Sequence, residues 1–440
     1  MERDRPGLAR PTRSPAALSE VEMASRKRIL VVMGTRPEAI KLAPLILKAK
    51  ADPDRFEVLA VRTSQHREML DQVVTYFDLP ILADLNVMRK DQGLTHVTTA
   101  VLQGLQQVIA SVHPDVVVVQ GDTTTSFVGA LAAFYENVPV AHVEAGLRTY
   151  DKQAPFPEEV YRRLTTVIAD FHFAPTETAR LNLLKENVPA GTIWVTGNTA
   201  IDALLLTLAK ATPEPSREKA PTLLLTTHRR ENHGEPMQRI CEAVLILLKG
   251  FPELRVVCPV HLSPRVRQVV EPMLGSHPRV SLVEPLGYED FVLAMNDAHI
   301  ILSDSGGVQE EAPALGKPVL VLRDSTERPE AVEAGTARLV GTEVAAIVSA
   351  CRELLTNPAA YRAMAQARNP FGDGHASEQI LDVLARSLDS TTRHEPAAPA
   401  ATPASAPPVR KRPREPALQV AMAADATTRL SSAAPNPGST

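Results

Sequence analysis

Residues 28–41 read RILVVMGTRPEAIK, which is an apolar run, then a glycine turn, then helix-forming sequence. A second junction of the same kind follows the apolar run His299–Leu302 and reads SGGVQEE from Ser305. A glycine turn between a parallel strand and a helix exposes backbone N–H groups at the positive end of the helix dipole, where anions bind. Two such sites in two halves of one chain predict a cleft that holds a phosphorylated ligand, with catalytic groups from both sides.

The body of the chain alternates short β-branched runs with amphipathic helical segments. Runs such as Val116–Val119 are typical of strands buried on both faces of a sheet. The alternation predicts an α/β fold of two Rossmann-like, doubly wound parallel sheets, separated by a polar linker at Ala211–Pro221. The expected strands are Ile29–Met33, Phe56–Arg62, Val116–Gln120, Val138–Val143, Phe171–Ala174 and Ile193–Thr196 in the first sheet, and Thr222–Thr226, Arg255–Val260, Val280–Val283, Ile300–Leu302 and Val319–Leu322 in the second.

We expect four segments along the chain. These are a flexible extension at residues 1–27, a first domain at 28–196, a second domain at 197–365 and a disordered tail at 389–440. A helix at 366–388 is expected to cross back and complete the first domain. The tail is rich in Pro and Ala and has no apolar periodicity, so it cannot bury enough surface to offset its ordering entropy.

Net charge, apolar runs and the spacing of cysteines and histidines indicate which classes of function the sequence does not favour. The formal net charge of −4 gives no general bias toward nucleic acid or a membrane surface. No apolar run approaches the roughly 18 residues of a transmembrane helix, and the N-terminal segment lacks the apolar core of a signal peptide. Cys241, Cys258 and Cys351 are far apart, which predicts reduced core thiols of a cytoplasmic protein. The histidines show no metal-ligand spacing, so we expect no metal site.

The first junction places Arg36 and Lys41 near the start of a helix. Both could be solvated cations beside a plain strand–helix turn. Pro37 suits the first helical position and Glu38 the first turn, which leaves Arg36 on the turn itself, where a phosphate would lie.

Three carboxylates lie where predicted strands end or helices begin. Asp122 lies in QGDTTT, Glu144 in HVEAGLR, and Glu158 in PFPEE. Taken separately, Asp122 could be an N-cap and Glu158 could merely favour a helix dipole. Together they predict a polar cluster at the carboxyl edge of the sheet, where ligands bind in open α/β folds.

The second predicted domain supplies further candidates. His228 follows its first strand, and is either a surface loop residue or a donor to a phosphate. Ser305–Gly307 is the most specific local signal, because two glycines let the backbone approach a phosphate closely. Glu311 is spaced to accept hydrogen bonds from ribose hydroxyls, and Phe291 either stacks on a base or fills core.

The chain resembles the non-hydrolysing UDP-N-acetylglucosamine 2-epimerases over roughly residues 28–387. The motifs that carry the resemblance are, in order, GTRPEAIKLAPLI, QHREMLDQ, QGDTTTS, HVEAGLRT, PFPEE, FAPTE, VTGN, HRREN, PVHL, DSGGVQEEAPALGKPVLVLR and TERPEAVEAGT. The resemblance implies two Rossmann-like domains in a GT-B-type arrangement, an interdomain active-site cleft, a homodimer, and no metal or redox cofactor.

Carried over position by position, the resemblance implies a role for each matching residue. The implied substrate contacts are Arg36, Lys41, Asp122, Glu144 and His228. Phe291 is expected to lie against uracil and Glu311 against the ribose. The residues expected to bind the diphosphate are Ser305, Gly306, Gly307 and Arg328. It associates catalysis with Asp122, Glu144, Glu158 and His228. Gln65 and His66 resemble a motif that binds a second, regulatory substrate molecule in some members, although Asp91 lies in a loop where some regulated members carry Arg. Other departures from the family pattern are Tyr161, Thr227 and Ser263.

The activity implied is reversible C2 epimerisation of UDP-N-acetylglucosamine to UDP-N-acetylmannosamine through 2-acetamidoglucal, in support of cell-surface polysaccharide synthesis. Breaking the C1–O bond to UDP first would acidify the C2–H bond, so that a carboxylate could then take that proton. Three alternatives stay open. They are a hydrolysing 2-epimerase that releases N-acetylmannosamine and UDP, a GT-B glycosyltransferase, and a non-catalytic sugar-nucleotide sensor.

Overall fold

The computed structural model describes residues 26–64, 67–89, 93–211 and 220–390. Strand β1 begins at Lys27 and helix α15 ends at Ser390, so regular structure extends into both the expected extension and the expected tail. Residues 1–25 and 391–440 lie outside the described residues, as do Gln65, His66 and Asp91.

The first sheet is seven-stranded among the described residues and entirely parallel, in the order β3-β2-β1-β4-β5-β6-β7. Its strands are β1 Lys27–Met33, β2 Phe56–Arg62, β3 Ile81–Asp84, β4 Val116–Gln120, β5 Val140–Val143, β6 Phe171–Ala174 and β7 Ile193–Val195. The helices between and after them are α1 Arg36–Lys50, α2 Arg67–Phe77, α3 Leu94–Val112, α4 Thr124–Tyr135, α5 Glu158–Ile168, α6 Glu177–Lys185 and α7 Thr199–Lys210.

The second sheet is also parallel, in the order β10-β9-β8-β11-β12-β13. Its strands are β8 Thr222–Thr226, β9 Arg255–Pro259, β10 Val280–Val283, β11 Ile300–Ser303, β12 Val319–Val321 and β13 Ala337–Leu339. The remaining helices are α8 Glu235–Gly250, α9 Pro264–Leu274, α10 Tyr288–Asp297, α11 Gly306–Glu311, α12 Pro329–Glu333, α13 Val344–Thr356, α14 Pro358–Ala365 and α15 Ala376–Ser390, with short 3₁₀ turns at Ala190–Thr192, Arg230–Asn232 and Ala312–Leu315.

The predicted fold class is confirmed by both sheets. Alternate residues of β1 enter different cores, since Ile29 and Val31 pack on one face of the sheet while Leu30 and Val32 pack on the other. A strand covered by helices on both faces needs this continuous apolar run, which is why RILVVM identified it.

Two strands were missed by the sequence reasoning. β3 and β13 are edge strands of four and three residues, and the side chains of β3 alternate between half-buried and exposed. Such short, partly solvated edges carry too little hydrophobic pattern to be distinguished from loops. The prediction of one helix over 366–388 was also wrong at its start, because α15 begins only at Ala376. Gly372 and Gly374, with φ of 118° and 90°, hold the preceding turn in a conformation that excludes a helix.

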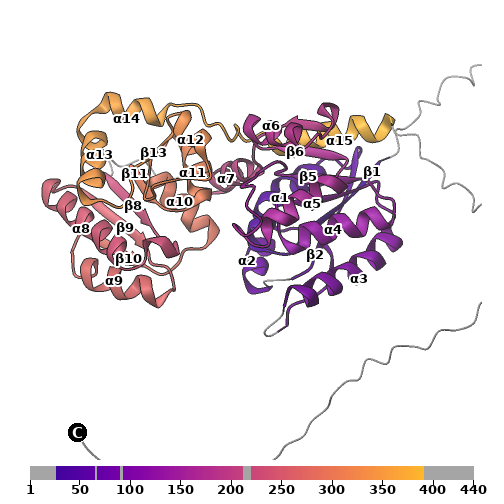
Figure 1. Cartoon of the computed structure of the whole chain (residues 1–440), viewed down its shortest axis with the longest axis horizontal. Helices are drawn as coiled ribbons and strands as arrows, with labels where there is room; N and C mark the ends of the chain where they lie inside the picture. Colours follow the sequence, from indigo (N-terminus) through magenta and orange to yellow (C-terminus); the bar gives the residue numbers. More distant parts are fainter. Residues whose placement is uncertain (1–25, 65–66, 90–92, 212–219, 391–440) are drawn as a thin grey trace, which may run out of the picture. The chain divides into compact units, whose positions relative to one another are not determined.

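Helix α15 packs on the first sheet although it lies at the end of the described chain. Its residues Ile380 and Leu384 join Leu42 of α1 in one buried cluster, and Figure 1 shows α15, in yellow, among the N-terminal elements. Helix α7 contributes Ala203 to that cluster and Ile201 to a cluster of the second sheet. The expected domain boundary at residue 197 therefore falls just before a helix that both cores share.

The order of strands changes direction between β1 and β4 in the first sheet, and between β8 and β11 in the second. In open α/β sheets the crevice at such a switch point, beyond the carboxyl ends of the strands, is where ligands bind. The turns after β4, β8 and β11 carry Asp122, His228 and Ser305. Arg36 was expected on the turn after β1, but α1 begins one residue earlier than predicted and Arg36 is its first residue. The topology thus brings the predicted anion and carboxylate motifs to the edge of the sheet suited to a ligand.

Candidate active site

The turn after β1 is held by a buried carboxylate. Glu38 is 1% exposed, and its Oε2 accepts hydrogen bonds from the backbone N–H of Gly34 at 3.0 Å and of Thr35 at 2.7 Å. Its Oε1 accepts from the hydroxyls of Thr123 at 2.7 Å and Ser126 at 2.9 Å, in the turn after β4. Burial raises the pKa of Glu38, and these donors oppose that rise. Glu38 therefore links the Gly34–Thr35 turn, just before Arg36, to the turn that carries Asp122.

Gly34 cannot be replaced without moving that turn. A Cβ added there would lie 2.1 Å from Oγ1 of Thr125 and 2.5 Å from Oγ1 of Thr63. The glycine thus permits close approach of β1 to the β4–α4 turn.

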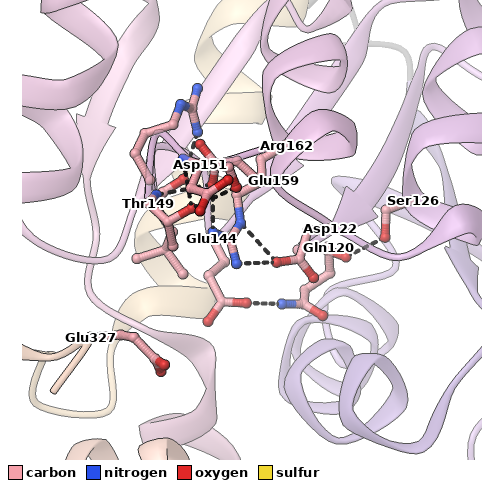
Figure 2. A network of polar contacts seen from close by, with 12 residues as sticks. Gln120, Asp122, Ser126, Glu144, Thr149, Asp151, Glu159, Arg162 and Glu327 are labelled. Atoms are coloured by element: carbon pink, nitrogen blue, oxygen red, sulfur yellow. Dashed lines mark hydrogen bonds and ion pairs between the residues drawn. The ribbon is translucent and has the colours of Figure 1, made fainter. Parts of the chain in front are cut away.

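Asp122 is not the N-cap of α4. Thr123 takes that place, since its hydroxyl accepts from the backbone N–H of Ser126 at 3.1 Å. Asp122 instead accepts through Oδ2 from both Nε and Nη2 of Arg162, at 2.9 and 2.6 Å. Arg162 also bonds Glu159 at 2.9 Å, and Figure 2 shows this arginine between the two acids. One oxygen of Asp122 is thus fixed, while Oδ1 makes no hydrogen bond to the described residues.

Glu144 directly follows β5, in a left-handed conformation with φ of 66°. Its Oε1 lies 2.6 Å from the ammonium of Lys41 and its Oε2 accepts from Nε2 of Gln120 (Figure 2). Burial alone would raise the pKa of Glu144, but the charges of Lys41 and Arg328 hold it below its usual value. Burial likewise opposes the charge of Lys41, yet the carboxylates around it raise the pKa of that ammonium. The pair is therefore ionised at neutral pH, in the interior of the protein.

His142, on β5, supports the turn that carries Asp122. It is fully buried, and its Nε2 lies 2.8 Å from the carbonyl oxygen of Gly121. A carbonyl can only accept, so Nε2 carries the proton. Burial lowers the pKa of His142 to about 3, which keeps the ring neutral.

Glu158 is less engaged than the other two carboxylates. It is the first residue of α5 and half-buried, and it makes no hydrogen bond or ion pair to the described residues. Its neighbour Glu159 is buried and accepts from the backbone N–H of Thr149 and of Tyr150, both at 3.0 Å. Gln120, which bonds Glu144, lies two residues before Asp122 in the chain, whereas Glu158 stands at the start of its helix without such a contact to the described residues.

His228, after β8, is oriented by a buried acid that sequence reasoning missed. Asp304 is fully buried, and its Oδ1 lies 3.2 Å from Nδ1 of His228. Its Oδ2 accepts from the hydroxyl of Thr227 at 2.7 Å, from Arg229 N at 3.0 Å and from Asn232 Nδ2 at 2.9 Å. Burial would raise the pKa of Asp304, but these donors and the His228 side chain hold it well below its usual range. Nδ1 of His228 donates to this carboxylate, so Nε2 is left for a ligand.

The candidate anion site of the second sheet lies around Ser305–Gly307. Ser305 directly precedes α11 at its N-cap position, without a capping hydrogen bond from its side chain, and a Cβ added at Gly306 would come within 3.8 Å of the Arg328 guanidinium. A cavity of about 390 Å³ is lined by residues that include Arg36, His228, Phe291 and Ser305. Phe291 packs against the core of the second sheet and also lines this cavity, and stacking on a base stays a prediction. A larger cavity of about 880 Å³, against α5 and α6, is lined by none of the predicted site residues.

Two neighbouring acids on α11 behave differently. Glu310 is buried and accepts from Nε of Arg328, and this charge is the main reason that the pKa of Arg328 is raised. Burial and the charge of Glu310 raise the pKa of Glu311 to about 8. Glu311 is therefore protonated at neutral pH in the ligand-free chain, and could donate as well as accept hydrogen bonds.

Several residues that take part in this arrangement were not among the predicted site residues. They include Glu38, Arg162, Asn198, Asp304 and Glu310. All of these except Arg162 lie within a motif quoted from the sequence, and Arg162 follows PFPEE by three residues. Gln65 and His66 lie outside the described residues. Among the described residues, no group of three or more His, Cys, Asp or Glu side chains could hold a metal ion.

The comparisons with known proteins decide the family. Residues 47–385 match the family model described as UDP-N-acetylglucosamine 2-epimerase. The UDP-N-acetylglucosamine 2-epimerase of Bacillus subtilis is 51% identical over 360 residues, which cover 81% of this chain and 94% of that protein. The chain belongs to the UDP-N-acetylglucosamine 2-epimerase family.

Solved structures of this epimerase family share the architecture. The crystal structure of the enzyme from Neisseria meningitidis bound to UDP-GlcNAc has a TM-score of 0.73 and 47% identity, over 82% of this chain and all of that one. The enzyme from Methanocaldococcus jannaschii, in complex with UDP-GlcNAc and UDP, has a TM-score of 0.66 and 35% identity, over 82% of this chain and 99% of that one. These matches confirm the predicted epimerase family and the two-domain, GT-B-like fold, and they support 2-epimerase activity on UDP-N-acetylglucosamine.

Proposed function

We propose that this epimerase interconverts UDP-N-acetylglucosamine and UDP-N-acetylmannosamine without hydrolysis, by elimination and re-addition of UDP. The observation that carries the proposal is the pairing of two kinds of group at the two switch points. Carboxylates of Asp122 and Glu144 lie after β4 and β5, and Arg36, His228, Arg328 and the Ser305–Gly307 backbone supply donors for a diphosphate. The reaction needs both, because a leaving diphosphate must be retained while a carbon-bound proton moves.

In the first step the C1–O bond to UDP breaks, and both of its electrons go to the phosphate oxygen. C2–H then loses its proton to a carboxylate, and the C–H electrons form the C1=C2 bond of 2-acetamidoglucal. The return step delivers a proton to the opposite face of C2 and reforms the bond between C1 and the UDP oxygen. Donors positioned at the departing phosphate stabilise the charge that develops there.

The geometry suggests different roles for the carboxylates. Both oxygens of Glu144 are engaged, by Lys41 and Gln120, so it suits stabilisation of positive charge that develops at C1. Asp122 has one oxygen fixed by Arg162 and one without a partner among the described residues, which suits a proton acceptor. Glu158 begins α5 and makes no hydrogen bond or ion pair to the described residues; we assign it to the opposite face of C2, because the reaction needs a second proton-transfer group there. A positioned proton transfer of this kind typically contributes about 10²- to 10⁴-fold to the rate.

The test is proton NMR of UDP-N-acetylglucosamine incubated with the purified chain, without an acceptor and with EDTA. The proposal predicts a stable mixture of the two sugar nucleotides. Free N-acetylmannosamine and UDP would instead identify a hydrolysing 2-epimerase. No conversion without a sugar acceptor would favour a glycosyltransferase or a sensor.

We further propose that the chain acts as a homodimer in the cytoplasm and supplies cell-surface polysaccharide synthesis. The described chain holds no helix that is both long and apolar enough to cross a membrane. Large apolar side chains are exposed on two helices that pack together, with Phe134 and Tyr135 on α4 and Val167, 85% exposed, on α5. Light scattering should find a dimer, and Val167→Glu should weaken it. A wild-type monomer at assay concentrations would refute the dimer.

A further inference from the structure

The side chain of Asn198 joins two buried carboxylates. Its Nδ2 donates to Oε1 of Glu144 at 3.1 Å and to Oε2 of Glu310 at 2.8 Å. Asn198 is 3% exposed, so water cannot replace either bond freely. One amide group has two hydrogens, and here each of them is directed to a different carboxylate.

The orientation of this amide is fixed by the backbone around it. Oδ1 of Asn198 accepts from the N–H of Ala200 at 3.0 Å and so caps α7. The N–H of Asn198 donates to the carbonyl oxygen of Phe371 at 2.7 Å. Rotating the amide by half a turn would place its oxygen against the two carboxylates and would uncap α7, so only the observed orientation satisfies all partners.

The two carboxylates belong to the two halves of the proposed site. Glu144 pairs with Lys41 at 2.6 Å and lies after β5. Glu310 lies on α11 and pairs with Arg328, whose guanidinium is beside the candidate diphosphate turn at Gly306. Asn198 donates a hydrogen bond to each of the two acids.

We infer that Asn198 is a positioning residue, which holds the Glu144 carboxylate for catalysis and connects it to the Glu310–Arg328 pair that meets the diphosphate. This inference rests on the proposed function, since it assigns Glu144 to the reaction and Arg328 to the diphosphate. Without the amide of Asn198, the carboxylates of Glu144 and Glu310 would both lose the donor that they share and would repel each other in the interior. Glu144 would then shift its position, its protonation, or both.

The charged groups that face Glu144 come from several elements. They are Lys41 of α1, Glu310 of α11 and Arg328 before α12, while His142 on β5 stays neutral. Glu311 is further along α11 and interacts with Glu310 and Lys41. A new negative charge at position 198 would therefore act against Glu144 and Glu310 and would be offset only by Lys41 and Arg328.

The sharpest test is Asn198→Asp, which keeps an oxygen to cap α7 and replaces the amino donor with a second oxygen. We expect kcat to fall by at least about 10-fold at pH 7, because a hydrogen bond to a charged group is lost at Glu144. The acidic limb of the kcat–pH profile should move up by about one pH unit or more, since the added carboxyl group raises the pKa of Glu144. A merely structural role of Asn198 would lower the thermal midpoint but would not move that limb.

Asn357→Asp is the matched control. Asn357 also caps a helix, because its Oδ1 accepts from Ala359 N and Ala360 N, but it is exposed and lies outside the proposed site. It should leave kcat and its pH profile unchanged. If Asn198→Asp does not fold, Asn198→Ser keeps a capping oxygen without added charge, and it should fold and still lose kcat.

The outcomes separate this inference from the proposed function. A wild-type chain that does not epimerise would refute the proposed function itself. An active wild type with an Asn198→Asp variant of equal kcat and an unmoved acidic limb would refute the role of Asn198 alone, and so would a folded Asn198→Ser variant with wild-type kcat.

Discussion

Replacing Asp304 with Asn should reverse the tautomer of His228. In the wild type, Oδ2 of Asp304 accepts from Thr227, Arg229 and Asn232, while Oδ1 accepts from Nδ1 of His228. An asparagine has one oxygen, and the three donors at the Oδ2 position require it there. The amino group must then occupy the Oδ1 position and face Nδ1 of His228. That nitrogen would have to accept, so the proton would move to Nε2.

The size of the effect follows from the bond that is lost. A hydrogen bond to a charged group contributes about 1.5–3 kcal/mol, and each 1.36 kcal/mol corresponds to a factor of ten in rate. We therefore expect kcat to fall by about 10- to 160-fold, because an Asn at position 304 would no longer stabilise the positive charge that His228 carries when Nε2 donates to the departing diphosphate. Asp304 is fully buried, so some loss of thermal stability should accompany the loss of rate.

Two measurements check this prediction. Initial rates of epimerisation give kcat, and nitrogen–proton correlation NMR of the ring reports which nitrogen of His228 is protonated. In a His228→Ala background, Asp304→Asn should cause little further loss of kcat, because the side chain at position 304 would have no imidazole left to orient. Full kcat together with a proton retained on Nδ1 would show that the acid does not orient His228 as the geometry indicates.

Three further predictions concern individual side chains. Asp122→Asn, Glu144→Gln and Glu158→Gln should each lower kcat by about 10²-fold or more with the fold intact, and wild-type rates in all three would show that these carboxylates have no part in the reaction. Glu311 has a pKa of about 8 in the folded chain, above its ordinary 4.5, so the stability of the wild type should fall as pH rises from 4.5 to 8. The thermal midpoint of Glu311→Gln relative to that of the wild type should therefore rise over this pH range. A difference in midpoint that does not change with pH would contradict the raised pKa of Glu311. Arg36→Ala should weaken UDP binding in calorimetry and release 2-acetamidoglucal that NMR can detect, whereas unchanged affinity would remove Arg36 from the diphosphate site.

The sequence predicted the fold because its pattern is local. Each central strand is buried on both faces, so runs such as Val116–Val119 stand out without any knowledge of their partners. β3 and β13 lie at sheet edges, where one side has no neighbouring strand, and their pattern is correspondingly weak. The late start of α15 depends on glycines at positive φ, a feature of the backbone that residue pattern alone did not reveal.

The candidate site also contains residues that the sequence could indicate and contacts that it could not. Asp122, Glu144 and His228 could be singled out because each lies one or two residues after the end of a strand. Asp304 could not be paired with His228 from the sequence, since that contact depends on the register of β8 and β11, which sets Thr226 opposite Ser303. The bond between Asn198 and Glu310 joins residues 112 positions apart and exists only once both sheets have formed. Long-range polar pairs of this kind follow from tertiary structure rather than from motif spacing.

The central claim is that the C2 proton leaves the sugar and returns from solvent while UDP is held. Incubating UDP-N-acetylglucosamine with the chain in D₂O and reading C2 by NMR and mass spectrometry tests this claim directly. The account predicts that UDP-N-acetylmannosamine carries deuterium at C2, with no accumulation of free N-acetylmannosamine. A product that keeps protium at C2 would contradict it, because no carboxylate would then have exchanged that proton.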